Sequence, residues 1–153
     1  MALTNTEICT RISAAAWRIV ILDPEPPHRL VSFGTAFAVS PTGLLLTARH
    51  VIATGKTFYA NPVLCLKNSP HEARLFTPIT PADLSIDTGA KETRPFSIDV
   101  AALAPVAAFT CDYLPLRRDT LAIGDEVIAA PVMQRQRWPG RSGGASSGNR
   151  RPI

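Results

Sequence analysis

The chain has 153 residues, which fits one ordinary domain or two small ones, and 46% of them are hydrophobic, so wholesale disorder is excluded. No apolar stretch reaches the roughly 18 residues of a membrane-spanning helix, and the three cysteines are far apart with no metal-ligand spacing, so neither a disulfide framework nor a zinc site is predicted. The net charge of +4 belongs to residues 134–153: removing their five arginines from the sixteen basic residues leaves eleven against twelve acidic ones.

The N-terminal segment, residues 1–16, does not match an export signal. Glu7 stands where a basic region belongs, and Arg18 interrupts the apolar run that follows. We expect a chain that stays in the cytoplasm, or one whose export signal is not recognised.

The elements that follow are mostly β-strands. Turn residues separate short, β-branched or apolar segments, and Ser40-Pro-Thr-Gly43 predicts a tight turn between two of them. Ala48–Ala53 is compatible with a short helix that ends by Gly55, residues 80–97 read as a loop, and no long amphipathic helix is predicted. The predicted strands are Trp17–Leu22, Phe33–Ser40, Leu44–Thr47, Lys56–Leu66, Arg74–Ile79, Ile98–Val106 and Leu121–Val132.

This pattern predicts an all-β protein with a Greek-key β-barrel. The barrel is placed at residues 17–108, and residues 109–133 are read as a connector and one further strand. Residues 134–153 are rich in Gly, Ser and Arg and hold little apolar surface, so a disordered basic tail is predicted there.

Three patterns stand in order along the chain. The first is Gly34-Thr-Ala-Phe-Ala-Val-Ser-Pro-Thr-Gly-Leu-Leu-Leu-Thr-Ala-Arg-His50-Val, the second is Ser97-Ile-Asp99-Val-Ala-Ala-Leu, and the third is Leu114-Pro-Leu followed by Leu121-Ala-Ile-Gly-Asp125-Glu-Val-Ile. Together they resemble the trypsin-like (chymotrypsin-fold) serine peptidases of bacterial type, over roughly residues 17–132. Arg49 departs from the family pattern, which has a small residue there in many members, and it is expected to point outward.

The resemblance implies the first barrel of a chymotrypsin-like double barrel and peptide-bond hydrolysis through an acyl-enzyme, with no cofactor. It assigns His50 as general base and then acid, and Asp99 as the carboxylate that orients it. The residues support this chemistry, because a serine hydroxyl needs an imidazole to accept its proton and the imidazole needs a carboxylate to fix its tautomer. Asp99 also stands in an apolar run where burial without a partner is costly. The two side chains are therefore expected within hydrogen-bond reach.

The family's nucleophile motif, G-x-S-G-G, is matched by Gly140-Arg-Ser142-Gly-Gly. Only 42 residues separate Asp99 from Ser142, too few for the strands of a second barrel, and a chance match is less surprising in a Gly/Ser-rich segment. We therefore expect the second barrel to be largely absent, as in a truncated or frame-disrupted product, with little or no peptidase activity from this chain.

Other readings stay open. His28 and His71 are expected in solvated loops and Asp125 in a turn, without a role. A non-catalytic β-barrel binding module is the alternative function. Nucleic-acid attachment through the arginines and Trp138 is the third reading, and a solvated tail is favoured over it. A complete enzyme would act on polypeptides, no membrane partner is expected, and the oligomeric state is not predicted.

Overall fold

The computed structural model describes residues 3–68, 71–81, 85–86, 96–117, 119–120 and 122–123. Within these ranges the protein is mostly β, with a closed barrel of six antiparallel strands and two helices. Of the predicted second-barrel strand, Leu121–Val132, only residues 122–123 are described. Ser142 and the predicted tail lie outside the described residues.

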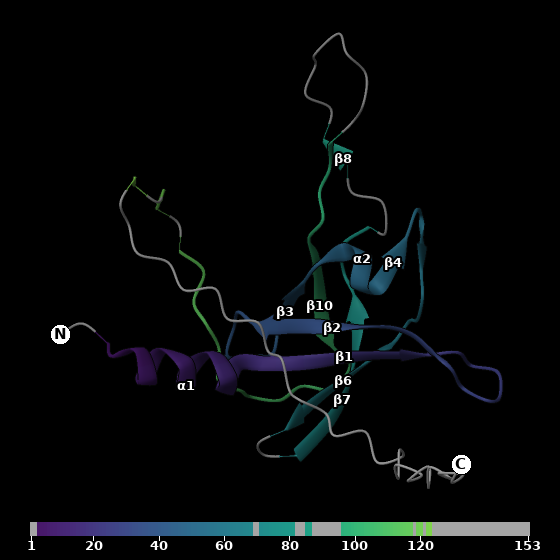
Figure 1. The fold of residues 1–153 in the computed structure, drawn as a ribbon, viewed down its shortest axis with the longest axis horizontal. Helices are drawn as coiled ribbons and strands as arrows, with labels where there is room; N and C mark the ends of the chain where they lie inside the picture. Colours follow the sequence, from purple (N-terminus) through teal and green to yellow (C-terminus); the bar gives the residue numbers. More distant parts are fainter. Residues whose placement is uncertain are drawn as a thin grey trace, which may run out of the picture.

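The barrel strands follow one another around the wall in the order β1-β2-β3-β10-β7-β6. Two further pairs of very short strands lie outside the barrel, β4 with β5 and β8 with β9. Figure 1 shows the barrel as the centre of the molecule, with helix α1 continuing the line of β1 away from it. The elements are α1 (Asn5–Ala15), β1 (Ala16–Leu22), β2 (Leu30–Ala38), β3 (Leu45–Thr47), α2 (Arg49–Ile52), β4 (Ala53–Thr54), β5 (Thr57–Phe58), β6 (Val63–Asn68), β7 (His71–Pro78), β8 (Ser85–Ile86), β9 (Phe96–Ser97) and β10 (Ala101–Pro105).

Alternation of side chains along the strands builds the core. In β1, Trp17, Ile19 and Ile21 are almost fully buried, whereas the residues between them are half-buried on the outer wall. Trp17 packs edge-to-face on Phe76, at 5.6 Å between ring centroids, and on Phe109, at 5.7 Å. Such geometry adds to the burial energy of aromatic residues.

The predicted hairpin around Ser40-Pro-Thr-Gly43 is present, because β2 pairs with β3 across it. Gly43 has a φ of +82°, and a Cβ there would lie 2.3 Å from Cε1 of Phe109. The connector then runs along this hairpin, since the N–H of Cys111 donates to the carbonyl of Pro41 and that of Leu114 to the carbonyl of Ala38.

The helix α1 was not predicted, although its start has a sequence signal. Thr4 and Glu7 form a capping box, in which the Thr4 hydroxyl accepts from the Glu7 N–H and the Glu7 carboxylate accepts from the Thr4 N–H. The hydrogen bond from the backbone N–H of Thr4, followed by the bond from its hydroxyl, lowers the pKa of Glu7. The sequence pattern does not indicate this helix, because only Ala15 of it is buried and it therefore needs no continuous apolar face.

Other boundaries also differ from the prediction. The segment Lys56–Leu66 is not one strand: it divides into β5 and β6, with a turn that contains Pro62 between them. His71 is not in a loop but begins β7, because β6 and β7 form a hairpin that extends to the pair of Asn68 and His71. The prediction for His71 was therefore wrong in structure, although its side chain is exposed as expected.

Candidate functional site

The pairing of β3 with β10 brings two distant segments to one end of the barrel. Thr47, the last residue of β3, stands opposite Ala101, the first residue of β10, and the two strands are antiparallel. The chain therefore leaves β3 at the same point at which it enters β10 (Figure 1). His50 follows Thr47 by three residues and Asp99 precedes Ala101 by two, so this register places them side by side.

The carboxylate of Asp99 holds His50 at two points. Oδ1 accepts the backbone N–H of His50 at 2.9 Å, and Oδ2 lies 2.6 Å from Nδ1 of the imidazole. The predicted contact between these side chains, 49 positions apart, is confirmed.

Asp99 also completes the N-terminus of α2. The N-cap residue is Ala48, which has no side chain that could accept a backbone N–H, and His50 is the second residue of the helix. A capping side chain usually accepts from the second or third residue of a helix, and the Oδ1 of Asp99 takes this role from another part of the chain. The sequence could not show this cap, because it depends on the register of β3 and β10.

The carboxylate is more exposed than the sequence suggested. The side chain of Asp99 is 51% exposed and that of His50 is 70% exposed. The expectation of a carboxylate in a buried apolar run was wrong, because β10 begins only at Ala101 and the residues before it, Val100 included, lie outside the barrel wall.

The pKa of Asp99 is held below its ordinary value. The main cause is the backbone N–H of His50, followed by the bond from its side chain, while the charge of Arg49 contributes least and partial desolvation acts in the opposite direction. An ionised Asp99 favours the tautomer with the proton on Nδ1. The second imidazole nitrogen, Nε2, then carries a lone pair and can accept a proton from a hydroxyl group.

An NMR titration of the carboxyl carbons checks this arrangement. We expect Asp99 to titrate below a typical aspartate, and His50→Ala to raise its pKa only part of the way, because the backbone N–H remains. Since the pKa is lower in the folded than in the unfolded chain, ionised Asp99 stabilises the fold above its unfolded pKa. That contribution is lost as the pH falls through the folded pKa. A full return to the ordinary value in His50→Ala would contradict the role given to the backbone bond.

Of the other residues that the sequence singled out, His28 and Arg49 have hydrogen-bond partners of their own. His28 is exposed in the loop after β1, with Nδ1 3.0 Å from the carbonyl oxygen of Asp23, as expected for a solvated loop histidine. Arg49 does not simply point outward: it is half-buried, and its guanidinium donates to the carbonyl of Gly55. Asp125 and Ser142 lie outside the described residues.

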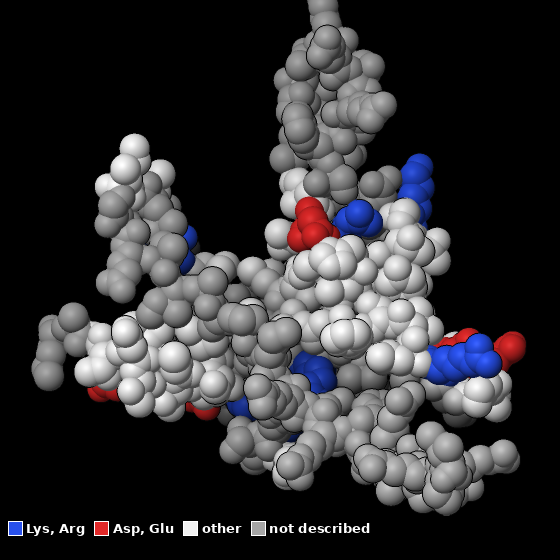
Figure 2. Space-filling model, viewed as in Figure 1, with Lys and Arg blue, Asp and Glu red and all other residues white. Residues whose placement is uncertain are grey.

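The described part of the chain contains no group of three His, Cys, Asp or Glu side chains that could hold a metal ion. All three cysteines carry free thiols, and burial raises the pKa of Cys65 to about 12, which makes this thiol unreactive. Figure 2 shows charged side chains in small groups, in places with acidic and basic residues side by side, while uncharged residues cover most of the described surface on this face.

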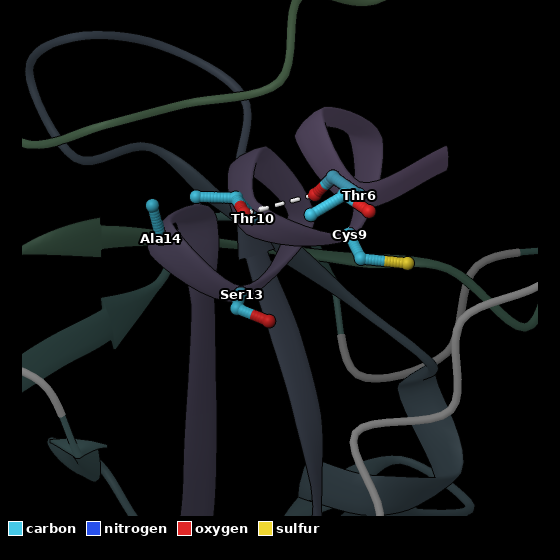
Figure 3. Close-up of a pocket in the computed structure, with 5 residues that line it drawn as sticks. All are labelled: Thr6, Cys9, Thr10, Ser13 and Ala14. Atoms are coloured by element: carbon cyan, nitrogen blue, oxygen red, sulfur yellow. Dashed lines mark hydrogen bonds between the residues drawn. The ribbon is translucent and has the colours of Figure 1, made fainter. Parts of the chain in front are cut away.

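Two hollows in the described part of the chain lie beside α1 and do not include the pair. A shallow hollow of about 440 Å³ beside α1 is lined by Thr6, Cys9, Thr10, Ser13 and Ala14 (Figure 3). The Thr10 hydroxyl donates to the carbonyl of Thr6 within the helix, and the lining carries no charged group. This hollow therefore lacks the paired acid–base groups that His50 and Asp99 provide at the barrel end.

Comparisons with protein-family models and with curated proteins find no match to this chain. Neither helix of the described ranges is long and apolar enough to cross a membrane.

Proposed function

We propose that the chain belongs to the trypsin-like serine peptidases and carries the general base and the orienting carboxylate of peptide-bond hydrolysis. The observation that carries the proposal is the double contact of Asp99 with His50, to the backbone N–H and to Nδ1. A carboxylate that served only as a helix cap would need the first contact but not the second.

The topology of the barrel supports the proposal. Counted along the chain, the fourth barrel strand, β6, returns to pair with the first, β1, while the first three strands follow one another around the wall. A 4-1-2-3 order is the one expected of a Greek key, and it therefore supports the barrel type that we propose. The resemblance in sequence implies the same kind of barrel.

In the proposed reaction, Asp99 keeps the proton of His50 on Nδ1 and stabilises the imidazolium that forms. The Nε2 of His50 accepts the proton of a serine hydroxyl as its oxygen attacks the peptide carbonyl, and then gives that proton to the leaving amine. The second half repeats the cycle with water and breaks the acyl-enzyme ester. The serine is assigned to no described residue; Ser142, in its Gly-x-Ser-Gly-Gly context, is the candidate that the sequence offers.

Labelling with a fluorophosphonate probe tests the proposal. We expect no measurable labelling of the 153-residue chain, because the probe needs a serine that His50 activates and an oxyanion hole. Only 42 residues separate Asp99 from Ser142, too few for the strands that would position both. An error of about 1 Å in position can cost on the order of a hundredfold in rate. Wild type is compared with His50→Ala and Ser142→Ala.

The outcomes separate the readings. Labelling that both substitutions abolish would establish a working serine and histidine in this chain and would refute our expectation for Ser142. A cooperatively folded chain that is never labelled, and whose His50 shows no bonded Nδ1 proton by NMR, would contradict the peptidase proposal.

The non-catalytic binding module remains the second candidate, and one observation favours it. Phe33, Val20, Leu64 and Leu75 stand opposite one another on four neighbouring strands, β2, β1, β6 and β7. Phe33 is 70% exposed and Leu75 is also exposed, so an apolar row crosses the outer wall of the barrel. Contiguous apolar surface of this kind often marks an interaction site.

A further inference from the structure

Helix α2 is a single turn and needs outside support to keep His50 in place. A helix of four residues is unstable alone, because nucleation is costly and few bonds compensate for it. Its N-terminal side is held by Asp99, as described above. At its C-terminal end, the carbonyl of Ile52 accepts the N–H of Tyr59, and the carbonyl of Val51 accepts the hydroxyl of Ser32 at 2.8 Å.

Two residues of β2 face this helix. Ser32 and Gly34 are two positions apart and therefore point to the same side of the strand. A Cβ on Gly34 would lie 2.6 Å from Cγ1 and 2.7 Å from Cγ2 of Val51, so the valine fills the space that glycine leaves open. Val51 is buried, and its β-branched side chain has little freedom to turn away.

Val51 is thus fixed at two points, its side chain over Gly34 and its carbonyl on Ser32. It directly follows His50, whose own N–H is bound by Asp99. The imidazole therefore sits between a contact to Asp99 on one side and a contact to β2 on the other. Loss of either contact would let α2 turn and would lengthen the 2.6 Å approach of Nδ1 to the carboxylate.

We propose that Ser32 is a positioning residue for His50: its hydroxyl, together with the open space at Gly34, sets the helix turn that presents the imidazole to Asp99. This inference deepens the proposed function and rests on it for its catalytic meaning. The geometry itself is testable without any activity. Sequence reasoning missed Ser32, because it stands just before the histidine motif, which begins at Gly34.

The test measures the rate at which the Nδ1 proton of His50 exchanges with water. This proton is observed in the downfield region of the ¹H NMR spectrum of the full chain. In Ser32→Ala we expect this exchange to be about fivefold faster than in wild type, the factor that corresponds to one ordinary hydrogen bond. Ser32→Thr keeps a hydroxyl and is expected to restore the slow exchange. Ser40→Ala is the matched control, because the Ser40 hydroxyl accepts the N–H of Leu44 beyond the other end of β2.

An unchanged exchange rate in Ser32→Ala, with the proton visible in wild type, overturns this inference and leaves the proposed function standing. Absence of the bonded proton in wild type itself removes the observation behind the proposed function.

If Ser32→Ala does not fold, a second pair of variants decides. Gly34→Ala is expected to displace Val51 and speed the exchange, and Gly34→Ala with Val51→Ala is expected to slow it again because the smaller side chain makes room. If the Nδ1 proton exchanges as fast in the double variant as in Gly34→Ala, the inference is overturned.

Discussion

Replacement of Phe76 with alanine is expected to lower the free energy of unfolding by about 3–5 kcal/mol. Phe76 is fully buried, and it packs edge-to-face on Trp17 and, at 6.1 Å between ring centroids, on Phe109. Its removal would leave a cavity between β7, β1 and the connector that this stiff barrel wall cannot close. Since small domains are stable by only about 5–15 kcal/mol, much of the fold's stability would be lost. Urea unfolding followed by tryptophan fluorescence measures the change.

Phe33→Ala is the matched control for this prediction. It makes the same chemical change in another barrel strand, but Phe33 is 70% exposed, so the expected effect on stability is within about 0.5 kcal/mol. If Phe33→Ala lowers the free energy of unfolding as much as Phe76→Ala does, the apolar row on the outer wall is covered in solution. Equal, small effects at both would contradict the position of Phe76 in the core.

The barrel could be predicted because its strands carry local signals. Turn residues at Ser40 to Gly43 and the alternation from Trp17 to Ile21 each specify an element without reference to the rest of the chain. The boundaries were less predictable where pairing decides them. β2 begins at Leu30, earlier than predicted, because its pairing with β1 continues past a bulge to Leu22.

The candidate site divides in the same way. The contact of His50 with Asp99 was predicted from the resemblance of two motifs, in their order along the chain, to those of a peptidase family. The roles of Asp99 as a helix cap and of Ser32 as a support could not be predicted, because each bond joins residues that only the sheet register brings together. The exposure of Asp99 was mispredicted for a related reason, since an apolar run says little about where a strand begins.

Asp99→Asn is expected to reverse the tautomer of His50. The side-chain amide can keep its oxygen toward the backbone N–H of His50, in the place of Oδ1, because α2 still needs that acceptor. Its NH₂ group then takes the place of Oδ2 and donates to Nδ1, which must give up its proton. The proton moves to Nε2, so the nitrogen that would accept the serine proton becomes a donor. The ¹⁵N chemical shifts of the uncharged imidazole distinguish the two tautomers directly.

Asp99→Ala is the comparison that separates the two roles of this carboxylate. Alanine removes the cap of α2 as well as the partner of Nδ1, so we expect a mixture of tautomers and a loss of about 1 kcal/mol in stability, the usual effect of removing a helix cap. Asparagine should keep most of that stability, because it keeps the oxygen that caps the helix, while it reverses the tautomer. Nδ1 protonated in Asp99→Asn as in wild type would mean that the carboxylate caps the helix without orienting the imidazole, and the case for His50 as a general base would fail with it.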